Sequence, residues 1–518
     1  MDEHADYVIV GAGSAGAVLA NRLSADGRHR VVVLEAGPRD RSPLIHIPAG
    51  FARLFRSRYD WAYRTVAQPN LQGRSIYWPR GKGLGGSSSI NAMMWVVGMR
   101  ADYDRWAELA GPAWGFDPMM AAMRRAVVPV EAQRDPRPVT RAFLDAIRET
   151  GGVVEAPNLP SPEGFTETVV TQASGRRASV ADAYLRPVRH RPNLVVRTQA
   201  RVTRVIVEGG RAVGVEYLVG RERRALGARA EVILAAGAVN TPQLLMLSGI
   251  GDEGALRRLG IRVVYHAPEV GRNLRDHLVA GMVLETTEPT LRSATSAAEV
   301  VRYFVGRRGM LTSNIAEAYG FWRSDPGLAA PDLEVLFAPV AYLGEGLVPI
   351  TVDGLTLGVI LLTPESRGSV TLASPDPLVG PRIDPAYLSD PDGHDRNRMI
   401  AGLERLEVLR TSRALRAHTT GRLLMPDHGE RLDPHERAVL ALESVAHTIY
   451  HPTSTARMGR DERSVVDPML RVRGVGALRV VDASVMPEIV RGHTNAPTIA
   501  IAERGAEIIL GEHASRER

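Results

Sequence analysis

The architecture of this chain is set near its N-terminus by Tyr7-Val-Ile-Val-Gly11-Ala-Gly13-Ser-Ala-Gly16-Ala-Val-Leu-Ala. The segment opens as an apolar run typical of a buried parallel strand and continues into a helix predicted over residues 15–23. Gly11 permits the tight turn, Gly13 lets the backbone approach a pyrophosphate, and Gly16 lets helix and strand pack closely. A Val-rich strand over residues 30–34 then ends at Glu35, whose carboxylate is placed to accept hydrogen bonds from ribose hydroxyls. The pattern predicts dinucleotide binding without separating FAD from NAD.

The composition is that of an ordinary globular protein. The 518 residues are 44% hydrophobic and 24% charged, and a chain of this length is expected to form more than one domain. Because cysteine is absent, disulfides, thiolate metal sites and iron–sulfur clusters are excluded, and we expect no metal site. Redox chemistry would therefore require a bound cofactor.

The net charge of +6 does not indicate nucleic-acid binding, because the arginines are spread along the chain and alternate with acids. No stretch reaches the ~18 consecutive apolar residues that cross a bilayer, so we expect no membrane span. Residues 1–6 are acidic and lead directly into a strand, without the features of a secretory leader. We therefore expect a cytoplasmic enzyme. The sequence predicts no particular oligomeric state.

The rest of the chain divides into three stretches. Strand-like segments at residues 194–196, 202–207, 213–217 and 231–234 have the spacing of a small antiparallel meander that feeds back into the main sheet. Residues 290–440 are less regular and rich in Pro-containing turns, which suits a lobe that covers a substrate. The end of the chain returns to a strand, residues 478–481, and a helix, residues 496–509.

A second glycine-rich loop, Pro79-Arg-Gly-Lys-Gly-Leu-Gly-Gly-Ser-Ser-Ser-Ile-Asn91, supplies the backbone donors and hydroxyls that a second phosphate or a ring system needs. Further motif blocks follow in order along the chain, at Gly237–Gly251, Gly271–His277, Pro364–Gly368, Tyr450–Gly459, Val481–Ser484 and Gly492–Pro497. On these motifs, which span nearly the whole chain, the sequence resembles the glucose–methanol–choline (GMC) family of FAD-dependent oxidoreductases. Its choline-dehydrogenase-like, aryl-alcohol-oxidase-like and hydroxymethylfurfural-oxidase-like members are the most similar.

The resemblance implies an α/β fold in which a discontinuous Rossmann-like FAD-binding domain is interleaved with an α+β substrate domain built on an antiparallel sheet. We expect residues 1–289 to form the N-terminal part of the FAD-binding domain, with some substrate-domain segments inserted. Residues 290–440 would form most of the substrate domain, and residues 441–518 the C-terminal part of the FAD-binding domain.

The resemblance also assigns catalytic roles to His451 and His493. His451 would take the hydroxyl proton of an alcohol while hydride leaves the α-carbon for flavin N5, and imidazole suits this task because its pKa lies near working pH. His493 would hold the substrate oxygen and share the alkoxide charge. Many relatives, including those that oxidise choline, have asparagine at the second position, so His493 weakens a choline assignment.

The residues expected to bind FAD fall in the same motifs. The helix that follows Asn495 and Pro497 would direct its N-terminus at the flavin and stabilise negative charge on the reduced ring. The complete expected set is Gly11, Gly13, Ser14, Gly16, Glu35, Ala36, Arg80, Gly83, Gly86, Ser87, Asn91, Ala92, Met94, Val202, Ala236, Gly237, Asp482, Ala483, His493, Asn495 and Pro497.

Four positions qualify the resemblance. Ile90 stands where some relatives have a histidine that bonds covalently to the flavin, so we expect non-covalent FAD. Residues 454–456, Ser-Thr-Ala, replace the usual Gly-Thr-Cys, a change we expect to be tolerated. Lys82, the only lysine, is either a chance survivor or a point charge beside phosphate or flavin. Glu317 is favoured as a structural carboxylate over a contact for a cationic substrate, because aromatic residues make up only 5% of the chain.

The sequence therefore predicts FAD-dependent oxidation of a primary alcohol to an aldehyde, with His451 as general base. Electrons would pass to O2 or to a quinone or dye acceptor. Two alternatives stay open: a choline-type dehydrogenase that uses a quinone or dye acceptor, and a hydroxynitrile lyase in which FAD does no redox work. A nicotinamide dehydrogenase and a non-catalytic flavin-binding protein are weaker alternatives.

Overall fold

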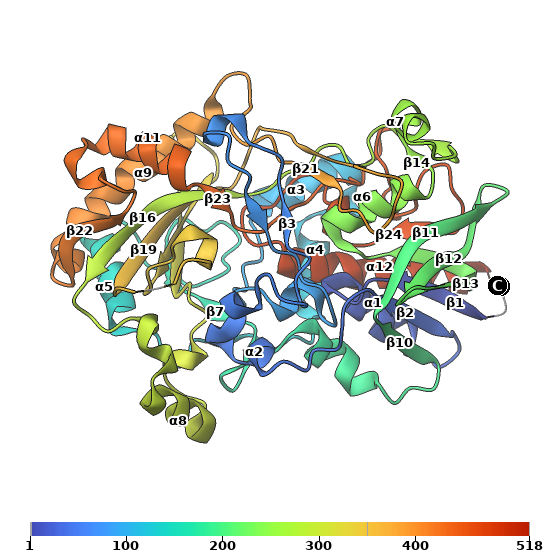
Figure 1. Ribbon diagram of the computed structural model, residues 1–518, viewed down its shortest axis with the longest axis horizontal. Helices are drawn as coiled ribbons and strands as arrows, with labels where there is room; N and C mark the ends of the chain where they lie inside the picture. Colours follow the sequence, from blue (N-terminus) through green and yellow to red (C-terminus); the bar gives the residue numbers. More distant parts are fainter. Residues whose placement is uncertain (1–2, 350, 517–518) are drawn as a thin grey trace.

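The computed structural model describes residues 3–349 and 351–516, and its two lobes are each built on a large β-sheet (Figure 1). The first sheet lies on the right of Figure 1 and the second on the left. Helix α12 (Asn495–Arg516) runs through the middle of the molecule beside α1 (Ser14–Leu23). The expected mixed α/β fold is confirmed, with one mixed and one antiparallel large sheet.

The first large sheet contains the strand–helix–strand unit predicted near the N-terminus. Its strand order is β10-β2-β1-β13-β12-β11, and β24 also pairs with β13. Strands β10, β2, β1, β13 and β24 are parallel neighbours, whereas β11, β12 and β13 form an antiparallel meander. The strand bounds are β1 (His4–Val10), β2 (Val31–Glu35), β10 (Leu194–Thr198), β11 (Ala200–Glu208), β12 (Arg211–Val219), β13 (Glu222–Leu234) and β24 (Leu478–Val480).

One predicted strand has a different place in the sheet. The segment at residues 194–196 was expected to belong to the antiparallel meander, but β10 pairs in parallel with β2 at the outer edge. Residues 36–193 separate these two strands, and a connection of that length can carry the chain back to the same end of the sheet. The other three segments form the meander as predicted.

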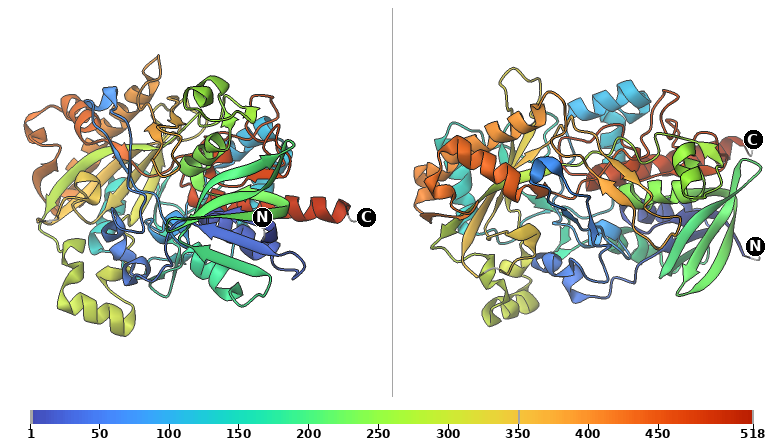
Figure 2. Two further views of the ribbon diagram at one scale, coloured as in Figure 1. Left: turned by 45° about the vertical axis from the view of Figure 1, so that its right-hand side comes forward. Right: turned by 45° about the horizontal axis from the view of Figure 1, so that its top comes forward.

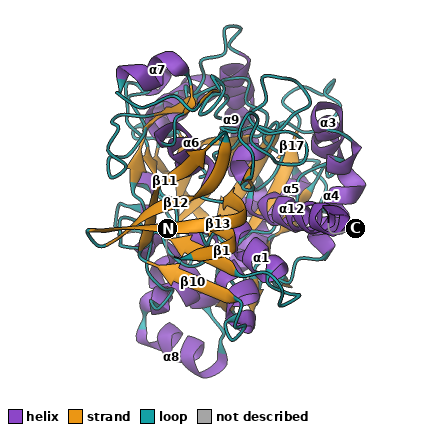
Figure 3. Ribbon diagram, turned by 90° about the vertical axis from the view of Figure 1, so that its right-hand side faces the viewer, coloured by secondary structure: helices purple, strands orange, loops and turns teal. Residues whose placement is uncertain are grey.

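The predicted helix at residues 15–23 is α1, and it packs against α12, which is the helix predicted at residues 496–509. Figure 3 shows both helices on the same side of the first sheet. The close approach of α1 to the sheet explains the last glycine of the opening motif, because a Cβ on Gly16 would lie 1.9 Å from the carbonyl oxygen of Gly11.

The second large sheet is antiparallel, with strand order β22-β16-β19-β18-β17-β6 and β23 beside β16. Helices α5 (Pro138–Glu149), α9 (His394–Thr411) and α11 (Pro434–Val445) pack on it and share a hydrophobic core with one of its faces. The strand bounds are β6 (Phe165–Glu167), β16 (Leu278–Thr286), β17 (Ala318–Trp322), β18 (Leu333–Ala338), β19 (Gly354–Leu361), β22 (Thr419–Met425) and β23 (His447–Thr448).

The remaining elements are short strands and helices that connect or flank the two lobes (Figure 2). The helices are α2 (Pro43–His46), α3 (Arg100–Ala110), α4 (Phe116–Arg124), α6 (Gly237–Leu247), α7 (Glu253–Arg258), α8 (Ala297–Gly306) and α10 (Arg413–Arg416). The strands are β3 (Tyr63–Arg64), β4 (Tyr77–Trp78), β5 (Glu131–Ala132), β7 (Val169–Val170), β8 (Gln172–Ala173), β9 (Arg176–Arg177), β14 (Ile250–Gly251), β15 (Tyr265–His266), β20 (Ser369–Thr371) and β21 (Arg382–Asp384).

The second sheet draws strands β6, β16 and β23 from outside residues 290–440. The division at 1–289, 290–440 and 441–518 stays a prediction. Over the residues that the structure describes, the helices lack the combined length and apolar character needed to cross a bilayer.

A buried ion pair fastens the end of the chain to the first sheet. Arg479 on β24 donates to both carboxylate oxygens of Glu231 on β13, at 2.6 and 3.0 Å, and to Glu512 on α12 at 2.7 Å. The side chains of Arg479 and Glu231 are almost completely buried. Strand β24 leads directly into residues 481–484, one of the motif blocks, so this pair holds part of the expected site in place.

We predict that Arg479→Met lowers the free energy of unfolding by about 3–5 kcal/mol, because it leaves the buried carboxylate of Glu231 without its positively charged partner. Denaturant unfolding followed by circular dichroism measures the change. The control is Arg204→Met, which breaks the largely exposed pair with Glu216 and should cost ~1 kcal/mol or less. Equal effects of the two substitutions would contradict the prediction.

Candidate functional site

A cavity of about 350 Å³ lies where the two lobes meet. On one side it is lined at the carboxyl ends of first-sheet strands, by Val10 and Leu34 among others. On the other side it is lined by Val279, Leu336 and Gly358 of the second sheet. The carboxyl ends of parallel strands are where open α/β sheets bind their ligands. A site here needs both lobes.

Most of the residues predicted from the motifs line this cavity. They are Gly11, Gly13, Ser14, Glu35, Ala36, Arg80, Gly86, Ser87, Asn91, Ala92, Met94, Val202, Ala236, Gly237, His451, Asp482, Ala483, His493 and Asn495. Gly16, Gly83 and Pro497 are not among the lining residues. Gly16 packs against Gly11, Gly83 donates its backbone N–H to Glu35 at 2.9 Å, and Pro497 lies in the first turn of α12.

Glu35 joins three turns at the end of β2. Its carboxylate accepts backbone N–H groups from Gly37 at 2.8 Å and from Gly83 and Ala12 at 2.9 Å. Burial raises the pKa of Glu35, and the three N–H donors oppose that rise. A carboxylate has about four lone-pair sites, so acceptor capacity is left for a ligand hydroxyl. The residue expected to bind ribose is therefore also a fastening point for both glycine-rich loops.

The two glycine-rich loops approach each other closely. A Cβ on Gly86 would lie 2.7 Å from the Cα of Gly13, and Gly86 has a φ of +51°. The N-cap residue of α1 is Gly13, so no N-cap side chain accepts a hydrogen bond from the first turn of that helix. The first backbone N–H groups of α1 are therefore available to an anion. Ser14, which follows, donates its hydroxyl to the side-chain oxygen of Asn495 at 2.7 Å. The contact links the two motif blocks at opposite ends of the chain.

Asp482 joins two segments that line a further part of the cavity. Its carboxylate accepts the backbone N–H groups of Gly237 and Ser484 at 2.8 Å and the hydroxyl of Thr241 at 2.6 Å. Burial raises the pKa of Asp482 against these donors. The carboxylate thereby holds the start of α6 against the segment that follows β24.

Arg177 was not predicted from the sequence, yet its side chain holds the second glycine-rich loop in place through several hydrogen bonds. Its buried guanidinium donates to the backbone oxygens of Ile45 at 2.7 Å, Ser88 at 3.1 Å and Asn91 at 2.6 Å, and to the Asn91 side chain at 2.7 Å. Burial lowers the pKa of Arg177 to about 9. A lone arginine between two other motifs gives no sequence signal, because its partners are mostly backbone carbonyls.

His451 and His493 lie against each other at the cavity wall. Their ring centroids are 4.7 Å apart, with an angle of 64° between the ring planes. His493 lies two residues before the start of α12, and His451 lies three residues after the end of β23. Thus the structure brings together two histidines that are 42 positions apart in the chain and belong to different motif blocks.

The backbone around His451 is held by two buried charged groups. Asp276 accepts the backbone N–H of His451 at 2.8 Å, and the hydroxyl of Tyr387 donates to the same carboxylate. Arg80, expected to contact the cofactor, donates to the carbonyl oxygen of Tyr450 at 2.6 Å. Desolvation lowers the pKa of Arg80 and raises the pKa of Asp276. Both groups line or adjoin the cavity and orient the residue between them.

The ring of His451 is oriented by His277, which the motifs flagged without a role. The Nδ1 atoms of the two rings are 3.0 Å apart, and His277 Nε2 is 3.1 Å from the carbonyl oxygen of Leu362. A carbonyl only accepts, so His277 Nε2 carries a proton. Burial lowers the pKa of His277 to about 3, so its ring is neutral and its Nδ1 accepts. His451 Nδ1 then donates, and its Nε2 is left with a lone pair.

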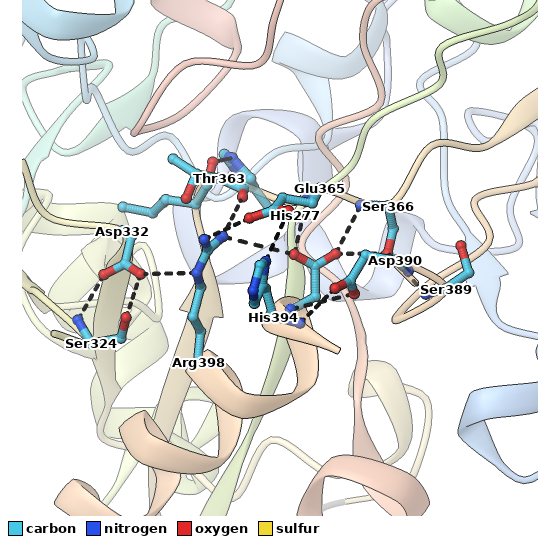
Figure 4. A network of polar contacts seen from close by, with 12 residues as sticks. His277, Ser324, Asp332, Thr363, Glu365, Ser366, Ser389, Asp390, His394 and Arg398 are labelled. Carbon is cyan, nitrogen blue, oxygen red and sulfur yellow. Dashed lines mark hydrogen bonds and ion pairs between the residues drawn. The ribbon is translucent and has the colours of Figure 1, made fainter. Parts of the chain in front are cut away.

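The loop that presents this carbonyl is itself anchored. Figure 4 shows Arg398 between Thr363, Glu365 and Asp332. Its guanidinium donates to the Thr363 carbonyl oxygen at 3.3 Å and to Glu365 at 2.6 Å, and it lies 3.6 Å from the Asp332 carboxylate. Glu365, Asp390 and His394 in the same view are close enough to ligate a metal ion, but they do not line the cavity. We assign no metal to them, since Arg398 and backbone N–H groups use their oxygens.

His493 has a different partner. Its Nε2 lies 3.0 Å from a carboxylate oxygen of Glu334, whose side chain is fully buried. The other Glu334 oxygen has no hydrogen-bond partner among the described residues. Glu334 lies on β18, where the alternation of the strand turns Leu333, Val335 and Phe337 into the core and Glu334 towards the cavity. A carboxylate inside an apolar strand, Leu-Glu-Val-Leu-Phe-Ala, was the available sequence signal, and it was missed.

The two residues with open interpretations have structural partners. Lys82 Nζ lies 4.6 Å from the ring centroid of Trp61, which lines the cavity, and burial lowers its pKa. Glu317 lies outside the cavity lining. Its carboxylate accepts hydrogen bonds from Ser313 at 2.7 Å and from Thr140 and the Arg137 backbone at 2.6 Å. The favoured structural role of Glu317 agrees with these contacts.

Comparison with known proteins extends this picture over the whole chain. The GMC oxidoreductase family model matches residues 5–279 with its N-terminal part and residues 364–502 with its C-terminal part. An uncharacterised GMC-type oxidoreductase of Mycobacterium tuberculosis is 52% identical over 98% of this chain and 100% of its own length. An alcohol dehydrogenase (acceptor) of Pseudomonas putida is 43% identical over 98% and 95%. The crystal structure of pyridoxine 4-oxidase from Mesorbium loti superposes with a TM-score of 0.87 at 32% identity, over 97% and 98%.

We predict that Arg177→Met lowers the free energy of unfolding by at least ~3 kcal/mol, because several buried oxygens lose their donor at once. Thermal unfolding of the purified protein measures the shift. Arg176→Met, at the neighbouring half-buried position, is the matched control and should cost ~1 kcal/mol or less. If both variants unfold at the same temperature, the hydrogen bonds of Arg177 do not stabilise the protein as predicted.

Proposed function

The chain belongs to the GMC oxidoreductase family, and we propose that it oxidises a primary alcohol to the aldehyde with bound FAD. The observation that carries the proposal is the pair His451 and His493 at the wall of a cavity that nucleotide-binding motifs line. A neutral imidazole lies behind the ring of His451, and a carboxylate lies behind the ring of His493. The first ring would accept a proton, and the second would donate a hydrogen bond.

The residues of the cavity fit FAD. Two backbones approach at Gly13 and Gly86 more closely than any side chain would allow, and the start of α1 lacks a side-chain cap. Glu35 would hold the ribose, the α1 N-terminus the pyrophosphate, and Asn495 at the start of α12 the ring. Ala36, Val202, Ala236, Gly237, Ala92, Met94, Ser87, Asp482 and Ala483 would line the remainder.

Bound FAD supplies flavin N5 as the acceptor for the hydride on the alcohol α-carbon. The protein supplies the proton acceptor. His451 Nε2 has a lone pair because Nδ1 donates to His277, so it can take the hydroxyl proton as the C–H bond breaks. Burial, followed by the electrostatic effect of His493, holds the pKa of His451 well below its ordinary value, so the ring is in the basic form at neutral pH.

His493 would bind the oxygen from which that proton leaves. A carboxylate oxygen of Glu334 accepts at this contact, so His493 Nε2 carries a proton and an acidic side chain lies behind the ring. Placed at the substrate oxygen, this ring would stabilise the negative charge that develops there as the proton leaves.

Three finer points belong to the same proposal. FAD would be held without a covalent bond, because Ile90 lines the cavity at the position of the flavin-linking histidine of some relatives. Electrons would leave to O2 or to a quinone or dye acceptor. The enzyme would act in the cytoplasm.

Two alternatives have less support. A choline-type dehydrogenase would have to hold the trimethylammonium group against the aromatic side chains that line the cavity, because Glu317 lies outside the lining. A hydroxynitrile lyase would use the same pair of histidines without reducing FAD. The next experiment separates these reactions.

We expect anaerobic addition of a primary alcohol to bleach the flavin absorbance of the purified protein. His451→Ala should slow this reduction by about 10²–10⁴-fold and leave the flavin content unchanged, because only the proton acceptor is lost. Stopped-flow absorbance over a panel of aryl, aliphatic and amino alcohols measures the rates, with the exposed His435→Ala as control. Cyanohydrin cleavage without bleaching by any alcohol would assign the lyase reaction instead.

The pKa of His451 also predicts a pH dependence. Since that pKa lies below its ordinary value, the acid limb of the kcat/KM profile should fall below about pH 6.5. His493→Asn removes a neighbour that lowers the pKa of His451, so the limb should move to higher pH, with a lower kcat. Steady-state rates across pH with the best alcohol test this. A limb that stays in place or moves to lower pH would contradict this effect of His493.

A further inference from the structure

The apolar residues of helix α8 face outward, whereas those of an ordinary surface helix face the protein interior. Val301, Phe304 and Val305 occupy one helical face at spacings of three and four and are 60%, 60% and 85% exposed. The opposite face contributes the buried residues Glu299 and Tyr303. A helix on a globular protein normally turns its apolar stripe inward. Here the apolar stripe points into the solvent.

The helix projects from the body of the molecule. Figures 1, 2 and 3 all show α8 beyond the outline of both sheets. Its apolar face is therefore displayed on a protrusion, where a large flat partner can reach it without a clash with the rest of the molecule.

The inner face is fixed, so the helix cannot rotate its apolar stripe inward. Tyr303 is buried in a cluster with Leu291, Met310 and Leu311. Glu299 accepts the backbone N–H of Met310 at 2.6 Å and pairs with Arg302 at 3.0 Å. Rotation would break these contacts, leave the buried N–H of Met310 without its acceptor and turn Tyr303 into the solvent.

Basic side chains border the apolar stripe. The guanidinium of Arg307 lies 4.7 Å from the ring centroid of Tyr303 and 5.9 Å from that of Phe304. Arg307 has a left-handed φ of +51° at the helix C-terminus, a position where glycine is common. Arg302 and Arg308 flank it, paired with Glu299 and Asp135. Arg134 also contacts this end of the helix, so arginines outnumber acids around the stripe.

We propose that α8 is a docking surface for a membrane that contains anionic lipids. Val301, Phe304 and Val305 would enter the boundary between headgroups and acyl chains, and the arginines would lie at the lipid phosphates. Apolar residues on one face, with basic residues beside them, are the composition of helices that lie in a membrane interface. The inference concerns binding alone and is independent of the oxidation proposed above.

A second copy of this chain fits the surface less well. In a symmetric pair, the same arginine border would face itself across the contact and repel. Stable protein interfaces bury about 800 Å² on each partner. Three side chains fall short of this, since even an aromatic residue buries only about 150–250 Å². A lipid surface has neither restriction.

The test is co-sedimentation of the full-length protein with vesicles. Vesicles of phosphatidylcholine with about one third phosphatidylglycerol are compared with vesicles of pure phosphatidylcholine. We expect binding to the first, weaker binding to the second, and release by high salt. The double variant Phe304→Ser, Val305→Asp should lower the partition coefficient by at least about tenfold. Arg307→Gln should lower it about fivefold, with anionic vesicles only.

The matched control is Val408→Asp, because Val408 is 54% exposed on α9, away from α8. It should bind vesicles as the wild type does. Far-UV circular dichroism checks that the variants keep their fold. The proposal is overturned if wild-type protein does not sediment with anionic vesicles, or if the double variant sediments equally well. A wild-type dimer in analytical ultracentrifugation that the double variant dissociates, without vesicle binding, would assign the surface to self-association.

Discussion

The carbonyl oxygen of Leu362 has no hydrogen to donate, and the proton arrangement of the whole candidate site follows from that constraint. His277 presents N–H to it, and because burial keeps this ring neutral, its other nitrogen accepts from His451. The nitrogen of His451 on the far side of the ring is then a lone pair. In the proposed reaction, the base would therefore be selected by a backbone group that does not line the cavity. The loop anchored by Arg398 keeps that group in place (Figure 4).

The second histidine is set in the opposite sense by charge. Glu334 is buried with one hydrogen-bond partner for its carboxylate, and such a group is stabilised when the partner is cationic. His493 in turn lowers the pKa of His451. In the proposed reaction, two identical side chains, 4.7 Å apart, would acquire complementary roles from what lies behind each of them. Both supports come from the second sheet or the residue before it, whereas the nucleotide motifs belong to the first.

The sequence was sufficient wherever neighbouring residues encode the structure. The apolar run, three glycines and acidic residue of the opening predicted β1, α1, β2 and the position of Glu35, because strand and helix periods are local properties. Most of the residues predicted from the motif blocks also line the cavity. The family was recognised from the order of those blocks, and the match over residues 5–279 and 364–502 agrees.

Only the tertiary structure assigned partners between segments that are far apart. His277 and Arg177 meet their partners across 174 and 86 positions, and Glu334 meets His493 across 159. It also placed β10 parallel to β2 and turned the apolar face of α8 outward. The physical reason is common to all of these. A residue type states which hydrogen bonds and contacts are possible, whereas packing of the whole chain decides which group is close enough to make them.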